Sequence, residues 1–332
     1  MKHLALDRLQ RRRPALGLPI AVIYKFSDDQ GAYLASLMTY YGFLSVFPLL
    51  LLAVTVLGFV LRGNPQLQST IIHSALSQFP DIGQQLSSVH GYRGSGLGLV
   101  VGLVGAVYGG MGVAQAAQNA MNVVWAVPRN ERPNPIKSRL RSLLLLAVLG
   151  AAVLATTGLS AISSGAGAFN SHLAVLGTGI RIGAIVLGAA VDVGIFIVAF
   201  RLLTAREVTT REILLGAVIA GVAWAVLQAV GTYYVAHSLK GTSAAYGLFA
   251  IVLGLVAWIH LESLVIVLCA ELNVVVRHRL YPRALLTPFT DDVDLTSADR
   301  KAYTSYAKAQ RNKGTEQIDV QFSPPPDEAG GR

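Results

Sequence analysis

The stretch from Tyr246 to Val276 reads YGLFAIVLGLVAWIHLESLVIVLCAELNVVV, an apolar run long enough to cross a bilayer. Four polar side chains interrupt this run: His260, Glu262, Glu271 and Asn273. On a helix with about 3.6 residues per turn, positions 11 apart differ by about 20°. His260 therefore shares one face with Glu271, and the other two polar groups share the opposite face. An ionisable group that faces lipid costs about 2.5 kcal/mol or more, so we expect this helix to lie centrally, with helices against both faces.

Composition places the chain among integral membrane proteins. Apolar residues make up 53% of its 332 residues and charged residues only 14%, against about 25% in soluble domains. The formal net charge is +9, but the basic residues flank apolar runs, so we expect no nucleic-acid partner. The single cysteine, Cys269, lies within an apolar run, which leaves no pair for a disulfide.

The hydropathy pattern predicts an all-α protein with three regions: a basic, amphipathic N-terminal arm over 1–30, a six-helix transmembrane domain over 31–276 and a largely disordered tail over 277–332. The arm is expected to lie in the membrane interface, with a solvated basic tail as the alternative, and no removable signal peptide is expected in it. Short amphipathic helices are expected in the loop after the first span. The six spans are 31–61, 96–127, 140–164, 176–203, 212–237 and 246–276.

The distribution of Lys and Arg predicts the orientation. Six spans put both termini on one side, and that side carries 23 of the 27 basic residues, against 4 on the other. By the positive-inside rule, both termini are therefore expected in the cytoplasm. The first span is longer than a bilayer core requires, and Pro48 is the expected hinge where it bends.

Small residues form one face of the second span. They recur at steps of four and three and leave a smooth surface that a neighbouring helix can approach closely. The expected partner is the small face of the last span. The expected packing residues are Gly98, Gly102, Gly105, Gly109 and Gly112 in the second span, with Gly247 and Gly254 in the last.

Amide side chains continue the same face of the second span, and further polar groups lie within other spans. Intramembrane polar groups are candidates for a substrate pathway, although they also serve as hydrogen bonds between helices. Glu262, at mid-span, is the candidate for a proton-titrating group near Asp192, Gln115 or Asn119; its alternative is a neutral acid bound to a backbone carbonyl. Glu271, close to Arg277, is expected to be an ionised anchor. The full candidate pathway is Gln115, Gln118, Asn119, Asn122, Asp192, Gln228, His260, Glu262, Glu271 and Asn273.

Several motifs together resemble the YihY/BrkB family of bacterial inner-membrane proteins, and within it the YhjD branch. They are Ala35-Ser36, Tyr40-Tyr41, Ser45-Val46-Phe47-Pro48, the run from Ala120 to Trp125, Gly216-Ala217 with Gly221 and Trp224, Tyr246-Gly247 to Trp258, and Ala270-Glu271-Leu272-Asn273. The resemblance covers about residues 24–279 and implies a six-helix fold in the inner membrane with both ends inside. His260 and Cys269 depart from the family pattern.

The resemblance implies three kinds of function, because family members have been labelled ribonuclease BN, serum-resistance factors and transporters of envelope lipids or small solutes. Nuclease chemistry needs clustered metal ligands, but the seven histidines form no His-x-His or His-x-x-x-His pair. No P-loop and no catalytic serine motif occurs. We therefore expect no enzyme, no metal and no cofactor. A transporter or flippase-like protein is favoured over a non-transporting scaffold for envelope assembly, with the bilayer and a lipid or solute as partners; the oligomeric state stays open.

Overall fold

The computed structural model describes residue 10 and residues 14–60, 96–167, 174–238, 244–287, 289–291 and 293–323. For some residues within the helices, the structure describes the backbone but not the side chain. These residues are 14–15, 53–60, 96–99, 152–167, 174–186, 229, 232–238 and 244–251. Gly98 and Gly247, two of the expected packing residues, fall among these. The loop after the first span, where short amphipathic helices are expected, lies outside the described residues as well.

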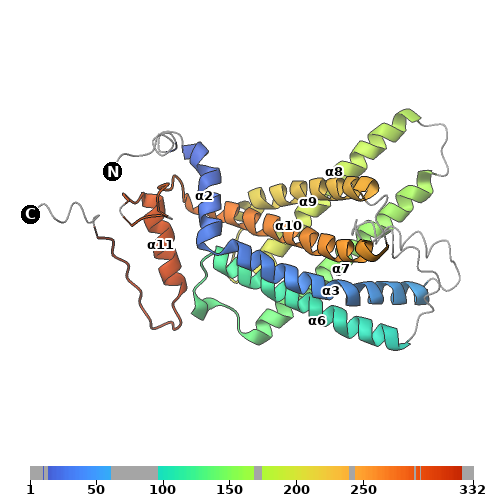
Figure 1. Ribbon diagram of the computed structural model, residues 1–332, viewed down its shortest axis with the longest axis horizontal. Coiled ribbons are helices and arrows are strands. Elements are labelled where there is room, and N and C mark those ends of the chain that lie inside the picture. Colours follow the sequence, from blue (N-terminus) through green and yellow to red (C-terminus); the bar gives the residue numbers. More distant parts are fainter. Residues whose placement is uncertain are drawn as a thin grey trace, which may run out of the picture.

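Every regular element in the described part of the chain is helical (Figure 1). The elements are α2 (Pro14–Asp28), α3 (Gly31–Val60), α6 (Gly96–Val124), the short 3-10 turn η1 (Arg129–Glu131), α7 (Pro135–Gly167), α8 (Ala174–Leu203), α9 (Thr210–Ser238), α10 (Ala244–His278) and α11 (Ser297–Ala309). The all-α prediction is confirmed at this level.

Four helices contain a described stretch that is long and apolar enough to cross a membrane. These stretches are Gly31–Leu52 in α3, Val100–Val124 in α6, Thr210–Gln228 in α9 and Val252–His278 in α10. The two further spans of the six-span prediction coincide with α7 and α8, whose side chains are described only in part.

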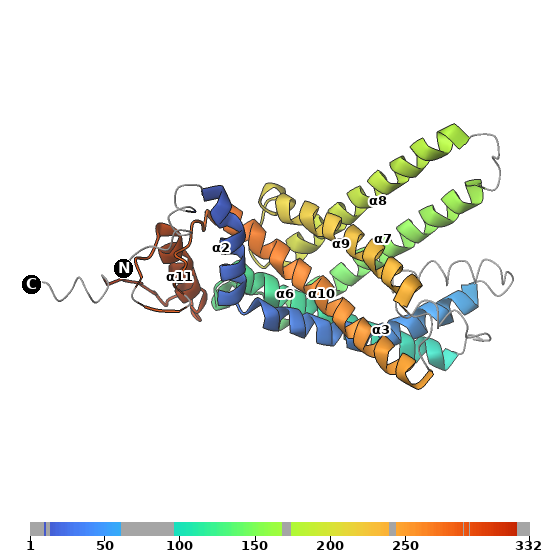
Figure 2. The same ribbon diagram turned by 45° about the horizontal axis from the view of Figure 1, so that its top comes forward.

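The helices lie lengthwise beside one another, and α2 crosses their basic end, which is the end that carries the α6–α7 and α8–α9 connections and the C-terminus of α10 (Figure 1). In both views α3 lies along α6, while the α7 and α8 pair diverges from the other helices (Figure 2). The helix α10 packs against α3, α9 and α2 and also touches α6. The prediction that the last span lies centrally is therefore confirmed.

The small-residue face of α6 packs against α3. A Cβ atom added at Gly105 would lie 2.7 Å from Cβ of Pro48, and one at Gly102 would lie 2.9 Å from the backbone nitrogen of Leu52. Gly109 and Gly112 approach Ser45 and Tyr41 of the same helix. The expected partner, the last span, is therefore wrong: α10 meets α3 through ordinary side chains, with Leu255 against Val46, and Gly254 is half-buried.

Pro48, the expected hinge, lies inside α3, which continues through it as one helix. Its ring faces the small surface of Gly105, so the proline fills the space that the missing side chain leaves. A hinge motion at Pro48 stays a prediction.

The buried core lies toward the basic end and is built largely from small and branched residues. Ala35 of α3, Ala120 of α6, Ala217 of α9 and Ala270 of α10 are all buried in one cluster. Alanine at these positions lets four helix backbones converge, which brings side chains from different helices within reach of one another.

The chain after α10 is folded back onto α2, contrary to the largely disordered tail expected from 277 onward. Ala284, Ala298 and Ala302 are buried, and α11 begins with a complete capping box. In this box the Thr296 hydroxyl accepts a hydrogen bond from the Asp299 nitrogen, and the Asp299 side chain accepts one from the Thr296 nitrogen. The described residues 283–287, 289–291 and 293–309 therefore differ from the disorder expected there, because composition does not reveal a helix that is fixed by a few specific contacts.

Candidate functional site

A buried ionic cluster joins the first and last helices at the basic end. Lys25, near the end of α2, is 1% exposed and lies with its Nζ atom 3.0 Å from Oε2 of Glu271 in α10. The same ammonium pairs with Asp29, one turn further along, and donates to the carbonyl oxygen of Val124 at 2.8 Å. Because Val124 is the last residue of α6, the charge also meets the negative end of that helix.

The cluster contains two carboxylates and one ammonium, and burial affects each group. Burial alone would lower the pKa of Lys25, but attraction from Glu271 and Asp29 outweighs it and raises the pKa above its usual value. Burial raises the pKa of Asp29, although Lys25 acts in the opposite direction. Lys25 therefore keeps its proton at neutral pH, and its positive charge offsets the cost of burying the two carboxyl groups.

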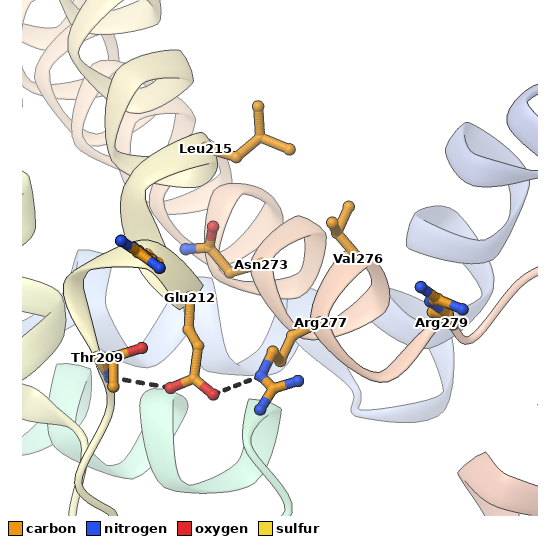
Figure 3. A pocket seen from close by; sticks show the side chains of 8 residues that line it. Thr209, Glu212, Leu215, Asn273, Val276, Arg277 and Arg279 are labelled. Carbon is orange, nitrogen blue, oxygen red and sulfur yellow. Dashed lines mark hydrogen bonds and ion pairs between the residues drawn. The ribbon is translucent and has the colours of Figure 1, made fainter.

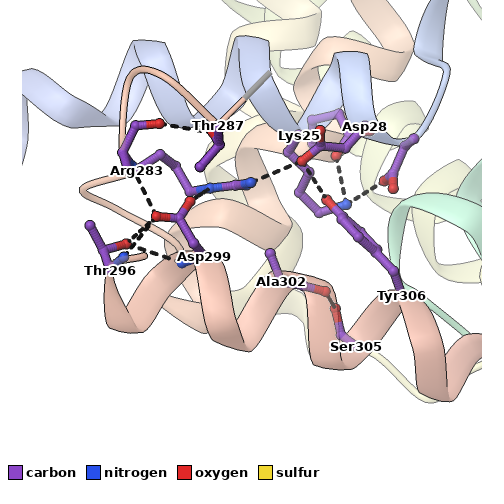
Figure 4. Close-up of polar contacts among 12 residues, drawn as sticks. Lys25, Asp28, Arg283, Thr287, Thr296, Asp299, Ala302, Ser305 and Tyr306 are labelled. Carbon is purple, nitrogen blue, oxygen red and sulfur yellow. Dashed lines mark hydrogen bonds and ion pairs between the residues drawn. The ribbon is translucent and has the colours of Figure 1, made fainter. Parts of the chain in front are cut away.

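A second ionic layer lies over the first and comes from the segment after α10 (Figure 4). Arg283, fully buried, has its Nη2 atom 2.9 Å from Oδ2 of Asp28 in α2 and pairs through Nε with Asp299 of α11. Burial acts to lower the pKa of Arg283, but Asp299 and Asp28 raise it overall. The ring of Tyr306 in α11 lies 5.6 Å from Nζ of Lys25. The segment thereby closes the basic end over the Lys25 cluster.

Four of the ten candidate pathway residues are engaged in contacts between elements. Gln118 of α6 donates from Nε2 to Oγ of Ser142 in α7 at 2.8 Å. Asn122 accepts from the nitrogen of Ala205 at 2.9 Å, and Asn273 of α10 accepts from that of Gly216 in α9 at 2.7 Å. Glu271 is the fourth, through Lys25. All four are buried, and their contacts hold helices and loops together.

His260 also has a partner, since its Nδ1 atom lies 3.1 Å from Oγ1 of Thr39 in α3. This contact lies on the α3 side of α10, as expected if the polar faces of the last span meet neighbouring helices. Gln228, half-buried in α9, makes polar contacts too.

The remaining candidates are Gln115, Asn119, Asp192 and Glu262. Gln115 and Asn119 are exposed on α6, and Asp192 and Glu262 are half-buried on α8 and α10. The principal neighbours of α8 are α9, α7 and α6, while those of α10 are α3, α9 and α2. Because α8 and α10 are not principal neighbours, these contacts do not support Asp192 as a neighbour of Glu262, which stays a prediction.

Sequence reasoning missed the residues of the ionic layers other than Glu271. Lys25 and Asp29 stand four apart, a spacing that places both on one helical face, but both lie in the arm that is predicted to rest on the membrane surface. Thr296 and Asp299 have the three-residue spacing of a capping box, which signals a helix start. Arg283 carried no signal beyond its place in an apolar stretch. Among the described residues, no group of three or more His, Cys, Asp and Glu side chains is placed to hold a metal ion.

Two comparisons found known proteins that are similar to this chain. The sequence model of the family described as Virulence factor BrkB matches residues 22–291. A curated relative, the Inner membrane protein YhjD of Escherichia coli (strain K12), is 23% identical over 295 residues, which cover 82% of this chain and 85% of the relative. No solved structure matches the chain. All residues of the two ionic layers except Asp299 and Tyr306 lie within 22–291, the part of the chain that matches the family.

Proposed function

The chain belongs to the Virulence factor BrkB family of membrane proteins, and we propose that it is a bacterial inner-membrane transporter or flippase-like protein for an envelope lipid or a small solute. The name of the YhjD relative supports the location. We propose six spans with both termini in the cytoplasm, α7 and α8 supplying the third and fourth. At about 1.5 Å per residue, their 33 and 30 residues are long enough to cross a bilayer.

Cysteine labelling tests this orientation. In a background that lacks Cys269, cysteines at Ser88 and Ser171, which lie outside the described residues, are expected to react with an impermeant thiol reagent in intact cells. A cysteine at the exposed Lys137, in the first turn of α7, is expected to react only after the cells are opened. Labelling of position 137 from outside would overturn the orientation.

One observation carries the transport proposal: Glu262 is half-buried at the middle of a membrane-length stretch and forms no ion pair with any described residue. A carboxyl group at this depth is costly, and the Trp258 side chain that interacts with it, one turn away on α10, supplies no positive charge as Lys25 does for Glu271. Gln115 and Asn119 are likewise exposed on a membrane-length stretch of α6. These groups suit a polar surface along which a headgroup or a solute moves.

The engaged polar groups favour the alternative, a non-transporting scaffold in envelope assembly. Four buried polar side chains each join two parts of the fold, as expected for the fixed contacts of a scaffold. They are Gln118, Asn122, Glu271 and Asn273. This explanation leaves Glu262 without a role. We further propose that the protein is no enzyme, uses no cofactor or metal and binds no nucleic acid.

Lipid movement in vesicles separates the two functions. The full chain is reconstituted with a trace of fluorescent phosphatidylglycerol, and dithionite, which destroys only the label in the outer leaflet, is added. Wild-type protein is expected to expose the protected label faster than protein-free vesicles. Glu262→Gln is expected to slow this exposure about tenfold, equal to about 1.4 kcal/mol of barrier, while Glu207→Gln, a change at an exposed loop position, leaves it unchanged.

The pH dependence of the same rate tests the proton role of Glu262. Glutamine keeps the size of the side chain but cannot titrate, so the wild-type rate is expected to change between pH 5.5 and 8 and the variant rate to stay flat. Label exposure no faster than in protein-free vesicles, at every pH, would contradict a lipid flippase and favour the scaffold.

A further inference from the structure

A pocket of about 500 Å³ opens between the beginning of α9 and the end of α10 (Figure 3). Thr209, Glu212 and Leu215 line it from the α9 side, and Val276 and Arg277 line it from α10. The pocket belongs neither to the Lys25 cluster nor to the candidate pathway around Glu262; of the pathway residues only Asn273 reaches its wall, and its side-chain oxygen is engaged by Gly216.

The wall of this pocket carries an excess of positive charge. Its lining includes three arginines, Arg211, Arg277 and Arg279, and one carboxylate, Glu212. Glu212 accepts a hydrogen bond from the Thr209 nitrogen at 2.9 Å and pairs with Nε of Arg277. Among the described residues, no hydrogen-bond or ion-pair partner contacts the two terminal nitrogens of Arg277. The same holds for the side chains of Arg211 and Arg279. A guanidinium that is held through Nε keeps four N–H donors on its two terminal nitrogens, and it is oriented to bind an anion.

The ends of two membrane-length stretches form the pocket, which indicates a position at the membrane boundary. It is formed by the first turn of the membrane-length stretch Thr210–Gln228 and the last turn of Val252–His278, so both stretches place it at the same level. The positive end of the α9 dipole and the negative end of the α10 dipole both lie there, so the net positive charge of the pocket comes from its arginines. Lipid phosphates occupy this level of a bilayer, and basic pockets between transmembrane helices bind anionic headgroups.

An exposed apolar ridge runs from the pocket along α9. Leu215, Val218, Val222 and Val226 recur at steps of three and four and are 40–55% exposed. At about 1.5 Å per residue the ridge extends about 16 Å, toward the middle of the bilayer. An acyl chain that leaves a headgroup in the pocket would lie along it, whereas a free phosphate ion would leave it uncovered.

We propose that this pocket binds the phosphate group of an anionic phospholipid, with an acyl chain along the α9 ridge. Arg211, Arg277 and Arg279 contact the phosphate, and Leu215 contacts the beginning of the chain. The site stands apart from any transport activity, because it needs neither Glu262 nor a moving substrate.

Thermal unfolding of the full chain, purified in maltoside detergent and stripped of lipid, tests the site. Dioctanoyl phosphatidylglycerol is titrated as mole fraction, and the melting temperature is expected to rise to a plateau. Dioctanoyl phosphatidylcholine and inorganic phosphate are expected to have no such effect. Arg211→Gln/Arg279→Gln is expected to weaken the apparent affinity about thirtyfold, equal to about 1 kcal/mol for each arginine.

The matched control is Arg129→Gln/Arg139→Gln, which removes two exposed arginines from the α6–α7 region, at the same end but outside the pocket. This variant is expected to keep the wild-type midpoint. The proposal is overturned if the pocket variant also keeps that midpoint, or if phosphatidylcholine protects as well as phosphatidylglycerol. Equal protection by inorganic phosphate would assign the pocket to a soluble anion and overturn the lipid.

Discussion

Lys25→Met is expected to destabilise the protein by about 3–5 kcal/mol, because it leaves two buried carboxyl groups without their cation. Glu271 is fully buried, so no water replaces the lost ammonium, and the Val124 carbonyl loses its donor as well. The expected observations are a large fall in the melting temperature of the protein in detergent and a low yield of monodisperse material.

Two further variants make this prediction specific. Lys301→Met removes an exposed lysine of α11 and is expected to have little effect. Lys25→Met/Glu271→Gln removes one of the stranded charges together with the lysine and is expected to recover part of the lost stability. If the double variant is as unstable as the sum of its single changes, the Lys25–Glu271 pair is not the source of the effect.

Gly216→Ala is expected to cost about 1–3 kcal/mol, the range for a methyl group forced into a filled interior. A Cβ atom at Gly216 would lie 2.5 Å from Nδ2 of Asn273 and still closer to the carbonyl oxygen of Cys269. The carbonyl belongs to the α10 backbone, so relief requires the two helices to separate. Separation would also lengthen the hydrogen bond from the Gly216 nitrogen to Asn273.

Gly194→Ala is the matched control for this change. A Cβ atom added at Gly194, in α8, meets nothing within 4 Å, and alanine favours a helix over glycine by roughly 0.5–1 kcal/mol. Thermal unfolding of both variants in the same detergent is therefore expected to move in opposite directions. Equal melting temperatures for Gly216→Ala and the wild type would mean that α9 and α10 do not approach closely at this point.

Helical periodicity predicted faces but not partners. The steps of four and three placed Gly102, Gly105 and Gly109 on one side of α6, and the structure has a helix against that side. Many helices could pack against such a face, however. The partner is α3 because its Ser45 and Pro48 lie opposite these glycines, which requires a particular register between the two helices. Periodicity along one helix contains no information about that register.

The polar residues show the same limit. Gln118 and Gln115 stand three residues apart on α6, and their amides are chemically alike, yet one is buried against α7 and the other is exposed. The difference is set by where α7 lies, which the sequence of α6 does not encode. Lys25 and Arg283 both belong to the charge count that predicts the cytoplasmic side of the membrane. Their burial depends on contacts with residues far away in the sequence, which local patterns do not reveal.

The closure of the basic end has a consequence for how the chain is made. Asp28 and Arg283 are 255 residues apart, and Glu271 and Tyr306 likewise reach Lys25 only from the far end of the chain. During synthesis, α2 is made before the other described helices. At that stage Asp29 is the only carboxylate of the Lys25 cluster that has been synthesised. The ammonium is enclosed when α10 has been inserted and α11 has docked. A chain that stops before residue 280 lacks Arg283, Asp299 and Tyr306, so its Lys25 cluster stays uncovered and charged at that end.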